Sequence, residues 1–304
     1  MIPIRSIAKH LIRSKFKIVL NSYRTTHSHG TKQACNKPYT TLMEPACKVA
    51  VITGGTEGIG FATAHQLLCC KAKHVALLDQ DIPKGFEAVN HLNCSHGKNK
   101  ATFIKCDVSN KEAVDDTFLK LKNEFETVDI IVNAAGLWDE TKWQQELQTN
   151  LVGTINVNLA VQQCFESSNA VVINLAGLSG LQPSSCSPIN SAEYAGIVRL
   201  SQSLGHQANF KRKGVRVVAL CVGLTSTNFI KDVHLRMLTA EMGKELQEEM
   251  KTALCQKAEA GARAVLELVR RAKTGSVWVV EGSRLLHVEM ADWRKSFTLE
   301  SQFT

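Results

Sequence analysis

The chain has 304 residues, of which 44% are hydrophobic and 21% are charged. This length and composition exclude an intrinsically disordered protein and a small disulfide-stabilised scaffold, and they suit one large α/β domain. No run of 18 apolar residues occurs, so the sequence predicts no membrane-spanning helix.

The net charge of +8 arises entirely in residues 1–43. This segment contains eight Lys or Arg and no Asp or Glu, while the rest of the chain contains 28 residues of each sign. The neutral remainder gives no reason to expect a nucleic-acid surface. For the basic N-terminal extension three interpretations stay open: a mitochondrial transit peptide, a disordered extension, or a start codon placed too early, with Met43 as the true start. We therefore expect the protein in the cytoplasm or in the mitochondrial matrix.

Residues 44–304 alternate short apolar runs with helix-length segments, and no repeat or linker divides them. Continuous apolar runs are typical of strands buried on both faces of a parallel sheet. The alternation predicts a single doubly wound α/β domain of about seven parallel strands, with helices on both faces. The expected strands are Val49–Thr53, His74–Asp79, Ala101–Cys106, Asp129–Asn133, Ala170–Ala176, Val215–Cys221 and Val277–Val280. The expected helices include Gly60–Lys71, Lys111–Glu126, Thr141–Phe165 and Asn190–Phe210.

A glycine-rich turn at residues 51–60 (VITGGTEGIG) lies between the first expected strand and the first expected helix. Gly54, Gly58 and Gly60 allow a sharp turn and a close approach to a pyrophosphate, which the helix N-terminus attracts. Asp79 ends the second strand, where its carboxylate can accept hydrogen bonds from adenosine ribose hydroxyls. Because that carboxylate repels a 2′-phosphate, the sequence predicts NAD rather than NADP.

The ten cysteines are scattered, without C-x-x-C pairs or the spacing of Cys/His zinc ligands. Free thiols in a reducing compartment explain this pattern best. The sequence analysis therefore predicts no metal site.

The segment Thr53-Gly54-x-x-x-Gly58-Ile59-Gly60 resembles the cofactor motif of the short-chain dehydrogenases/reductases. Further landmarks follow in the order of that family over about residues 48–282. They include Asn133–Gly136, which is similar to Asn-Asn-Ala-Gly, and Asn150, which matches the active-site Asn. The cofactor-binding residues that the resemblance implies are Gly54, Glu57, Gly58, Ile59, Gly60, Asp79, Asp107, Val108, Asn133, Gly136 and Thr227.

Within this family, Trp143 ahead of Leu147–Asn150, together with residues 275–293, resembles 15-hydroxyprostaglandin dehydrogenase and the insect alcohol dehydrogenases. The resemblance implies a Rossmann-like fold and an NAD-dependent oxidoreductase that acts on secondary alcohols or ketones. It also implies a homodimer.

Active members of the family use Ser, Tyr and Lys, and the Lys cation lowers the pKa of the Tyr that transfers the proton. In this chain Gly177, Asn190 and Tyr194 stand at the positions of Ser, Tyr and Lys, and of the active-site residues only Asn150 is retained. An Asn side chain has no titratable proton near neutral pH. We therefore predict a pseudoenzyme that binds NAD(H). The alternative is an active, divergent alcohol or 15-hydroxyprostaglandin-type dehydrogenase that uses Tyr194 and Ser179.

Overall fold

The structure, a computed structural model, describes residues 40–166 and 168–290. The strands of its central sheet are β1 (Val49–Thr53), β2 (His74–Asp79), β3 (Ala101–Lys105), β4 (Ile130–Asn133), β5 (Val171–Gly177), β6 (Arg216–Val222), β9 (Val277–Glu281) and β10 (Arg284–Val288). They are ordered β10-β9-β6-β5-β4-β1-β2-β3, and all neighbours run parallel except β9 and β10. The doubly wound fold is thus confirmed. β7 (Thr225–Ser226) and β8 (Gln256–Lys257) form a separate two-stranded sheet.

The central sheet has eight strands where about seven were expected, because the sequence pattern did not indicate the antiparallel edge strand β10. It follows β9 through a two-residue turn in which Gly282 and Ser283 both have positive φ, as a tight hairpin turn requires. Its residues are only partly buried and include Arg284 and His287. Such an edge strand lacks the continuous apolar run by which the other strands were found.

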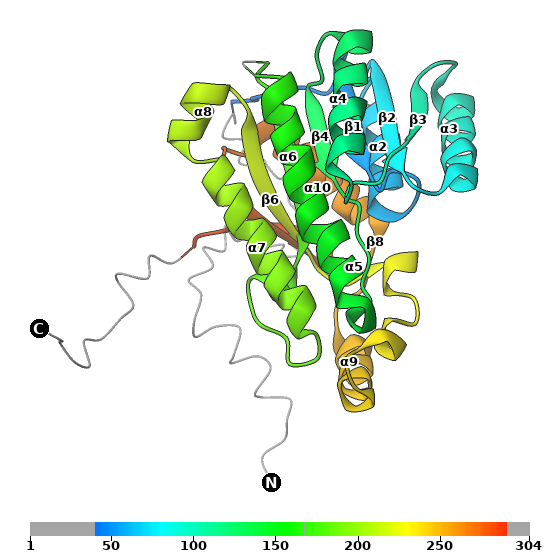
Figure 1. Cartoon of the computed structure of the whole chain (residues 1–304), viewed down its shortest axis with the longest axis vertical. Helices are drawn as coiled ribbons and strands as arrows, with labels where there is room; N and C mark the ends of the chain where they lie inside the picture. Colours follow the sequence, from blue (N-terminus) through cyan, green and yellow to red (C-terminus); the bar gives the residue numbers. More distant parts are fainter. Residues whose placement is uncertain (1–39, 167, 291–304) are drawn as a thin grey trace, which may run out of the picture.

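Helices cover both faces of the sheet (Figure 1). The helices are α2 (Gly58–Cys69), α3 (Ile82–His96), α4 (Lys111–Phe125), α5 (Trp143–Leu147), α6 (Gly153–Cys164), α7 (Pro188–Leu204), α8 (Gln207–Lys213), α9 (Ala240–Thr252) and α10 (Ala258–Arg271). One apolar core packs α2, α3 and α10 against the sheet, and a second packs α4 and α6 against its other face. α7 extends this second layer over β5 and β6.

Two long helices expected from the sequence are interrupted. A π-helical segment, Gln148–Val152, separates α5 from α6. α7 ends at Leu204 because the chain at Gly205 runs against another backbone: a Cβ there would lie 2.3 Å from the amide nitrogen of Gly275. Only glycine fits so close a backbone contact.

The first described residues are tied to the rest of the fold. The Leu42 amide donates a hydrogen bond of 2.6 Å to the carbonyl oxygen of Arg270 on α10, and the Met43 side chain is buried. The basic residues 1–39 and the C-terminal Trp293 lie outside the described residues. Across residues 40–166 and 168–290, none of the helices combines the length and the apolar character needed to cross a bilayer.

Candidate functional site

A cavity of about 740 Å³ opens at the carboxyl edge of the sheet, beside the neighbouring strands β1 and β4. The chain order reverses between these two strands, because β2 and β3 lie on one side and β5 and β6 on the other. Ligands of open α/β sheets bind at this kind of switch point. The glycine-rich turn and Asp79 line one part of the cavity, and the N-terminal part of α7 lines another.

The glycine-rich turn packs closely against the chain's own backbone at two of its glycines. Gly54 has φ +61°, and a Cβ on it would lie 2.7 Å from the Ala135 amide nitrogen. A Cβ on Gly60 would lie 2.1 Å from the Gly54 carbonyl oxygen. Glu57, the residue preceding α2, makes no side-chain cap, so the first-turn amides are left for an anion. The residues therefore fit the pyrophosphate of a dinucleotide.

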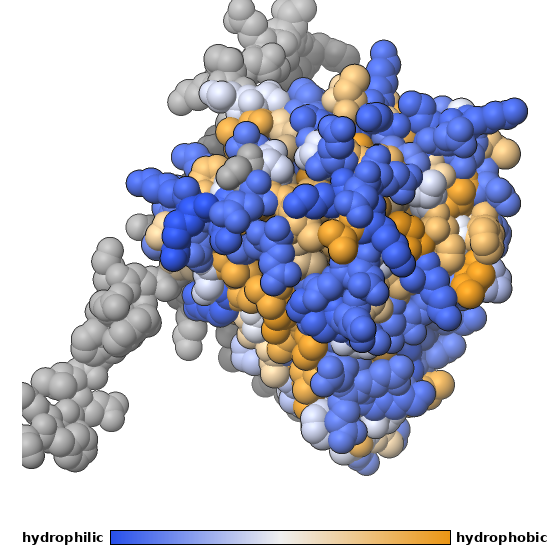
Figure 2. Space-filling view, turned by 45° about the horizontal axis from the view of Figure 1, so that its top comes forward, coloured by the Kyte–Doolittle hydropathy of each residue, from blue (hydrophilic) through white to orange (hydrophobic). Residues whose placement is uncertain are grey.

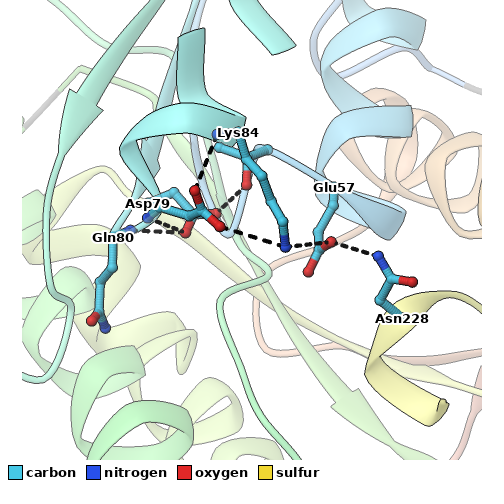
Figure 3. Close-up of polar contacts among 7 residues, drawn as sticks. Glu57, Asp79, Gln80, Lys84 and Asn228 are labelled. Carbon is cyan, nitrogen blue, oxygen red and sulfur yellow. Dashed lines mark hydrogen bonds and ion pairs between the residues drawn. The ribbon is translucent and has the colours of Figure 1, made fainter. Parts of the chain in front are cut away.

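Asp79, at the end of β2, is held with its carboxylate in a fixed orientation (Figure 3). Thr56 Oγ1 donates a hydrogen bond of 2.6 Å to one oxygen, and the Gln80 amide donates one of 2.8 Å to the other. Asp79 and Gln80 both line the cavity. A carboxylate held at this place can accept from ribose hydroxyls, as the sequence analysis expected.

Lys84 was not found from the sequence. Its Nζ lies 3.1 Å from Glu57 Oε2 and 3.6 Å from Asp81 Oδ2. Figure 3 shows the Lys84 side chain extending toward Glu57. Asn228 Nδ2 donates a hydrogen bond of 2.8 Å to the same Glu57 oxygen. These contacts offset the negative charge of Glu57 in the glycine-rich turn. The hydrogen bond to Glu57 raises the pKa of Lys84. A Lys five residues after the strand-ending Asp79 is the signal that could have identified it.

The cavity brings together all the predicted cofactor-binding residues except Asp107. The Asp107 carboxylate turns to Ser109 instead and accepts hydrogen bonds from its amide (2.9 Å) and its hydroxyl (2.7 Å). It thus closes a local turn, while its neighbours Cys106 and Val108 face the cavity. The predicted residues that line the cavity are Gly54, Glu57, Gly58, Ile59, Gly60, Asp79, Val108, Asn133, Gly136 and Thr227.

The predicted catalytic positions lie together on the same cavity. Gly177 ends β5, and Asn190 and Tyr194 lie in the first two turns of α7. Ser179 Oγ donates a hydrogen bond of 2.9 Å to Asn190 Oδ1. A Cβ on Gly177 would lie only 2.5 Å from Cε2 of Tyr194. The Tyr194 ring therefore fills the place where a serine side chain at position 177 would extend.

Tyr194 is a poor proton acceptor in this setting. Burial raises the pKa of its phenol above the ordinary value. In an active relay a Lys cation has the opposite effect. The hydroxyl group therefore stays neutral at neutral pH.

Asn150 sits in the π-helical segment and is 3% exposed. Its amide group is fully engaged: Oδ1 accepts from the Leu137 amide (2.8 Å), and Nδ2 donates to the Leu137 carbonyl (2.7 Å) and to Glu193 Oε1 (2.5 Å). Asn190 Nδ2 donates to the same Glu193 oxygen at 3.1 Å. Glu193 thus links the retained Asn150 to Asn190.

Three glutamates with no exposed surface, Glu140, Glu146 and Glu193, lie behind the cavity wall. The backbone amide of Asn190 donates to Glu140 Oε1 (3.1 Å), and the backbone amide of Asp139 donates to Glu146 Oε2 (2.7 Å). Burial raises the pKa of all three carboxyl groups, and that of Glu193 reaches about 9. We call these residues the buried glutamate cluster. It was missed because helical glutamates are usually exposed.

Arg236 brings a cation to the cavity, beyond the site positions that the sequence analysis named. Its Nη2 donates to the carbonyl oxygens of Lys231 (2.8 Å) and Phe229 (3.2 Å). Its Nε is buried without a hydrogen-bond partner among the described residues. Leu246, Glu249 and Met250 of α9 line the cavity as well, so this part of it combines apolar side chains with one basic and one acidic group.

Comparison with known proteins is consistent with the geometry of this cavity. Residues 48–238 match the family profile described as short chain dehydrogenase. The chain is 35% identical to 15-hydroxyprostaglandin dehydrogenase [NAD(+)] of Bos taurus over 204 residues, which is 66% of this chain and 75% of the relative. It is 25% identical to alcohol dehydrogenase 1 of Ceratitis capitata over 252 residues, 81% of this chain and 96% of the relative.

Solved structures share the fold. L-sorbose reductase from Gluconobacter frateurii, complexed with NADPH and L-sorbose, superposes with a TM-score of 0.67 at 24% identity, covering 79% of this chain and 98% of that chain. Levodione reductase superposes with a TM-score of 0.68 at 20% identity, over 78% and 97% of the two chains. Because the family profile covers most of the described residues, the chain belongs to the short-chain dehydrogenase/reductase family of oxidoreductases.

Proposed function

We propose that the chain binds NAD(H) in the cavity at the carboxyl edge of the sheet and lacks the proton relay by which its family interconverts secondary alcohols and ketones. Support for cofactor binding comes from the glycine-rich turn, which lines the cavity and leaves the first-turn amides of α2 without a side-chain cap, and from the fixed Asp79 carboxylate. When bound, the nicotinamide supplies a hydride donor or acceptor. The chain's own residues would cradle the phosphates and hold the adenosine ribose.

The observation that carries the loss of activity is the packing of Tyr194 on Gly177. The neutral phenol occupies the space of the missing serine side chain, and the Asn190 amide stands at the usual position of the proton donor. Proton transfer requires a titratable group about 3 Å from the substrate oxygen. Asn190 has none, and its amide is bonded to Ser179 and Glu193.

The competing proposal is an active dehydrogenase in which Tyr194 and Ser179 act on a small alcohol or ketone. It is favoured by one observation, that both side chains line the same cavity as Asn190. The raised pKa of Tyr194 argues against it, because the tyrosinate needed as a base is scarce at neutral pH.

Titration of the full chain with NADH and NADPH tests cofactor binding. Trp138 lines the cavity, so transfer of tryptophan emission to the nicotinamide reports occupancy. We expect NADH to bind at least about tenfold more tightly than NADPH, because Asp79 repels a 2′-phosphate. Failure of both dinucleotides to bind would overturn the proposal, whereas turnover of secondary alcohols at rates normal for enzymes would favour the competing one.

Replacing the Asp79 carboxylate should weaken NADH binding selectively. Hydrogen bonds to a charged group contribute about 1.5–3 kcal/mol, so Asp79→Ala should raise the Kd for NADH about 10- to 100-fold. The Kd for NADPH should rise less or fall, because the repulsion is lost too. Asp116→Ala, which removes an exposed carboxylate from α4, is the matched control and should leave both values unchanged. Equal effects of Asp79→Ala on the two dinucleotides would contradict the assigned role.

We extend the proposal to a homodimer formed by the face that carries α6 and α7 (Figure 1). Leu159 on α6 is 40% exposed. In the space-filling view a strip of apolar residues crosses an otherwise largely hydrophilic surface (Figure 2). Sedimentation equilibrium of the native chain and of Leu159→Glu tests this: the substitution should shift a dimer toward the monomer.

For the compartment, the basic residues 1–43 favour the mitochondrial matrix as strongly as the cytoplasm.

A further inference from the structure

Three side chains that can ligate a metal converge at the ends of two helices, on the face of the sheet that packs α2, α3 and α10. His65 and Cys69 lie one turn apart on α2, and His96 is the last residue of α3. One ligand atom from each of the three lies within 4.8 Å of the others. Nothing in the proposed dinucleotide chemistry uses these residues, and none of them lines the cavity.

We propose that His65, Cys69 and His96 form a binding site for a borderline-soft divalent cation, Zn²⁺ above all. Two imidazoles and a thiolate are the donor set that zinc prefers, and three protein ligands leave a fourth position for water. Cys69 is exposed, which gives that position access to solvent. The sequence analysis missed the site because the third ligand comes from a different helix.

The distances suit tetrahedral coordination. Zn–S and Zn–N bonds of about 2.3 and 2.0–2.1 Å imply a sulfur-to-nitrogen separation of about 3.6 Å. Cys69 Sγ and His65 Nδ1 are 3.6 Å apart. The rings of His65 and His96 have centroids 4.7 Å apart at an interplanar angle of 70°. Side-chain rotations that shift the ligand atoms by about 1 Å would bring the remaining pairs to tetrahedral separations.

His96 provides the second, independent observation. Its Nε2 is buried, and no hydrogen-bond partner for it occurs among the described residues. Buried polar atoms in folded proteins are rarely left unpaired, and a bound cation would satisfy this nitrogen.

The position of the site also favours a cation and gives it a structural consequence. Cys69 and His96 are the last residues of their helices, where the helix dipoles concentrate negative charge. At their other ends, α2 begins in the glycine-rich turn, and the first turn of α3 contains Lys84. A metal that joins the two C-terminal ends would fix the relative position of the elements that form the adenosine side of the cavity. α2 and α3 are also joined by an edge contact between the rings of Phe61 and His91.

The test uses the full chain after removal of metals by a chelator. Zn²⁺ is titrated in competition with a chromophoric chelator, and Co²⁺ is added separately to detect a thiolate-to-cobalt charge-transfer band. The variants are Cys69→Ser and His96→Asn, with Cys94→Ser as the control that removes an exposed cysteine of α3 outside the cluster. Residues 1–39 also contain His and Cys, so the measured quantity is the difference between Cys69→Ser and Cys94→Ser rather than total uptake.

The native chain and Cys94→Ser should bind one Zn²⁺ with the same Kd at this site and show the cobalt band. Cys69→Ser and His96→Asn should each raise that Kd at least about tenfold, and Cys69→Ser should abolish the band. Native melting temperatures of the metal-free variants would show that they fold. Equal Zn²⁺ affinity in all four proteins, or a cobalt band that survives Cys69→Ser, would overturn the proposal. The readout is independent of dinucleotide binding, so the two proposals fail separately.

Discussion

The triple variant Gly177→Ser/Asn190→Tyr/Tyr194→Lys should oxidise simple secondary alcohols with NAD about 10²–10⁴-fold faster than the native chain. A general acid–base contributes a factor of this size, and the three substitutions restore the groups that the family uses at these positions. Formation of NADH, followed by its absorbance with a series of secondary alcohols, measures the gain. A triple variant that folds and binds NADH without any gain in rate would contradict the proposal, as would a native chain that already turns over as fast.

The structure predicts that these substitutions are coupled. Gly177→Ser alone places a Cβ 2.5 Å from the Tyr194 ring, so it should lower the free energy of unfolding by about 1–3 kcal/mol through overpacking. In Gly177→Ser/Tyr194→Lys the ring is absent, and much of that loss should be recovered. A double-mutant cycle from urea unfolding measures the coupling. Additive losses would mean that the contact between position 177 and Tyr194 has no energetic importance.

Glu193→Gln should make the protein more stable above neutral pH and flatten the dependence of its stability on pH. The pKa of Glu193 is raised from 4.5 to about 9 in the folded chain, so the folded state holds a proton that the unfolded state releases. The contribution of the protonated Glu193 to the free energy of unfolding is therefore fully present below about pH 4.5, and it is lost as the pH rises toward 9. The slope of the unfolding free energy is at most about 1.4 kcal/mol per pH unit. Glutamine keeps the acceptor for Asn150 and Asn190 without a titrating group.

Urea unfolding of the native chain and the variant between pH 6 and pH 9 measures this difference. Glu140 and Glu146, whose pKa values burial also raises, leave part of the slope in place in the variant. Glu87→Gln, which changes an exposed glutamate of α3, is the control and should reproduce the native slope. If the native chain and Glu193→Gln had parallel profiles, the buried carboxyl group would not be protonated.

The parts of the fold that could be predicted from the sequence are those determined by local pattern. Buried parallel strands are continuously apolar, and the glycine-rich turn needs its glycines for a local reason, so these were located to within a residue or two. The strand β10 was missed because it is a half-exposed edge. The break after α7 was missed because it depends on the close approach of Gly205 to Gly275, two residues far apart in the chain.

In the candidate site, too, the features set by local sequence could be predicted, whereas those set by contacts between distant elements could not. Asp79 and the phosphate cradle are properties of a strand end and the turn that follows a strand. Lys84, the buried glutamate cluster and the contact between Tyr194 and Gly177 depend on which helices meet, and periodicity does not show this. Asp107 was expected to face the cofactor, but its carboxylate finds nearer partners in Ser109. Asn150 has its amide fully bonded to Leu137 and Glu193, which a motif alone cannot reveal.

The contact between Tyr194 and Gly177 also restricts the order in which mutations could restore an active site. A lineage that first acquires a serine at position 177 would pass through a poorly packed intermediate, because the ring is still present. A lineage that first replaces the ring at position 194 opens the space and leaves every later step accessible. The packing of one aromatic side chain on one glycine therefore orders the substitutions that lead to a Ser-Tyr-Lys triad: replacing Tyr194 first avoids the overpacked intermediate that Gly177→Ser alone would produce.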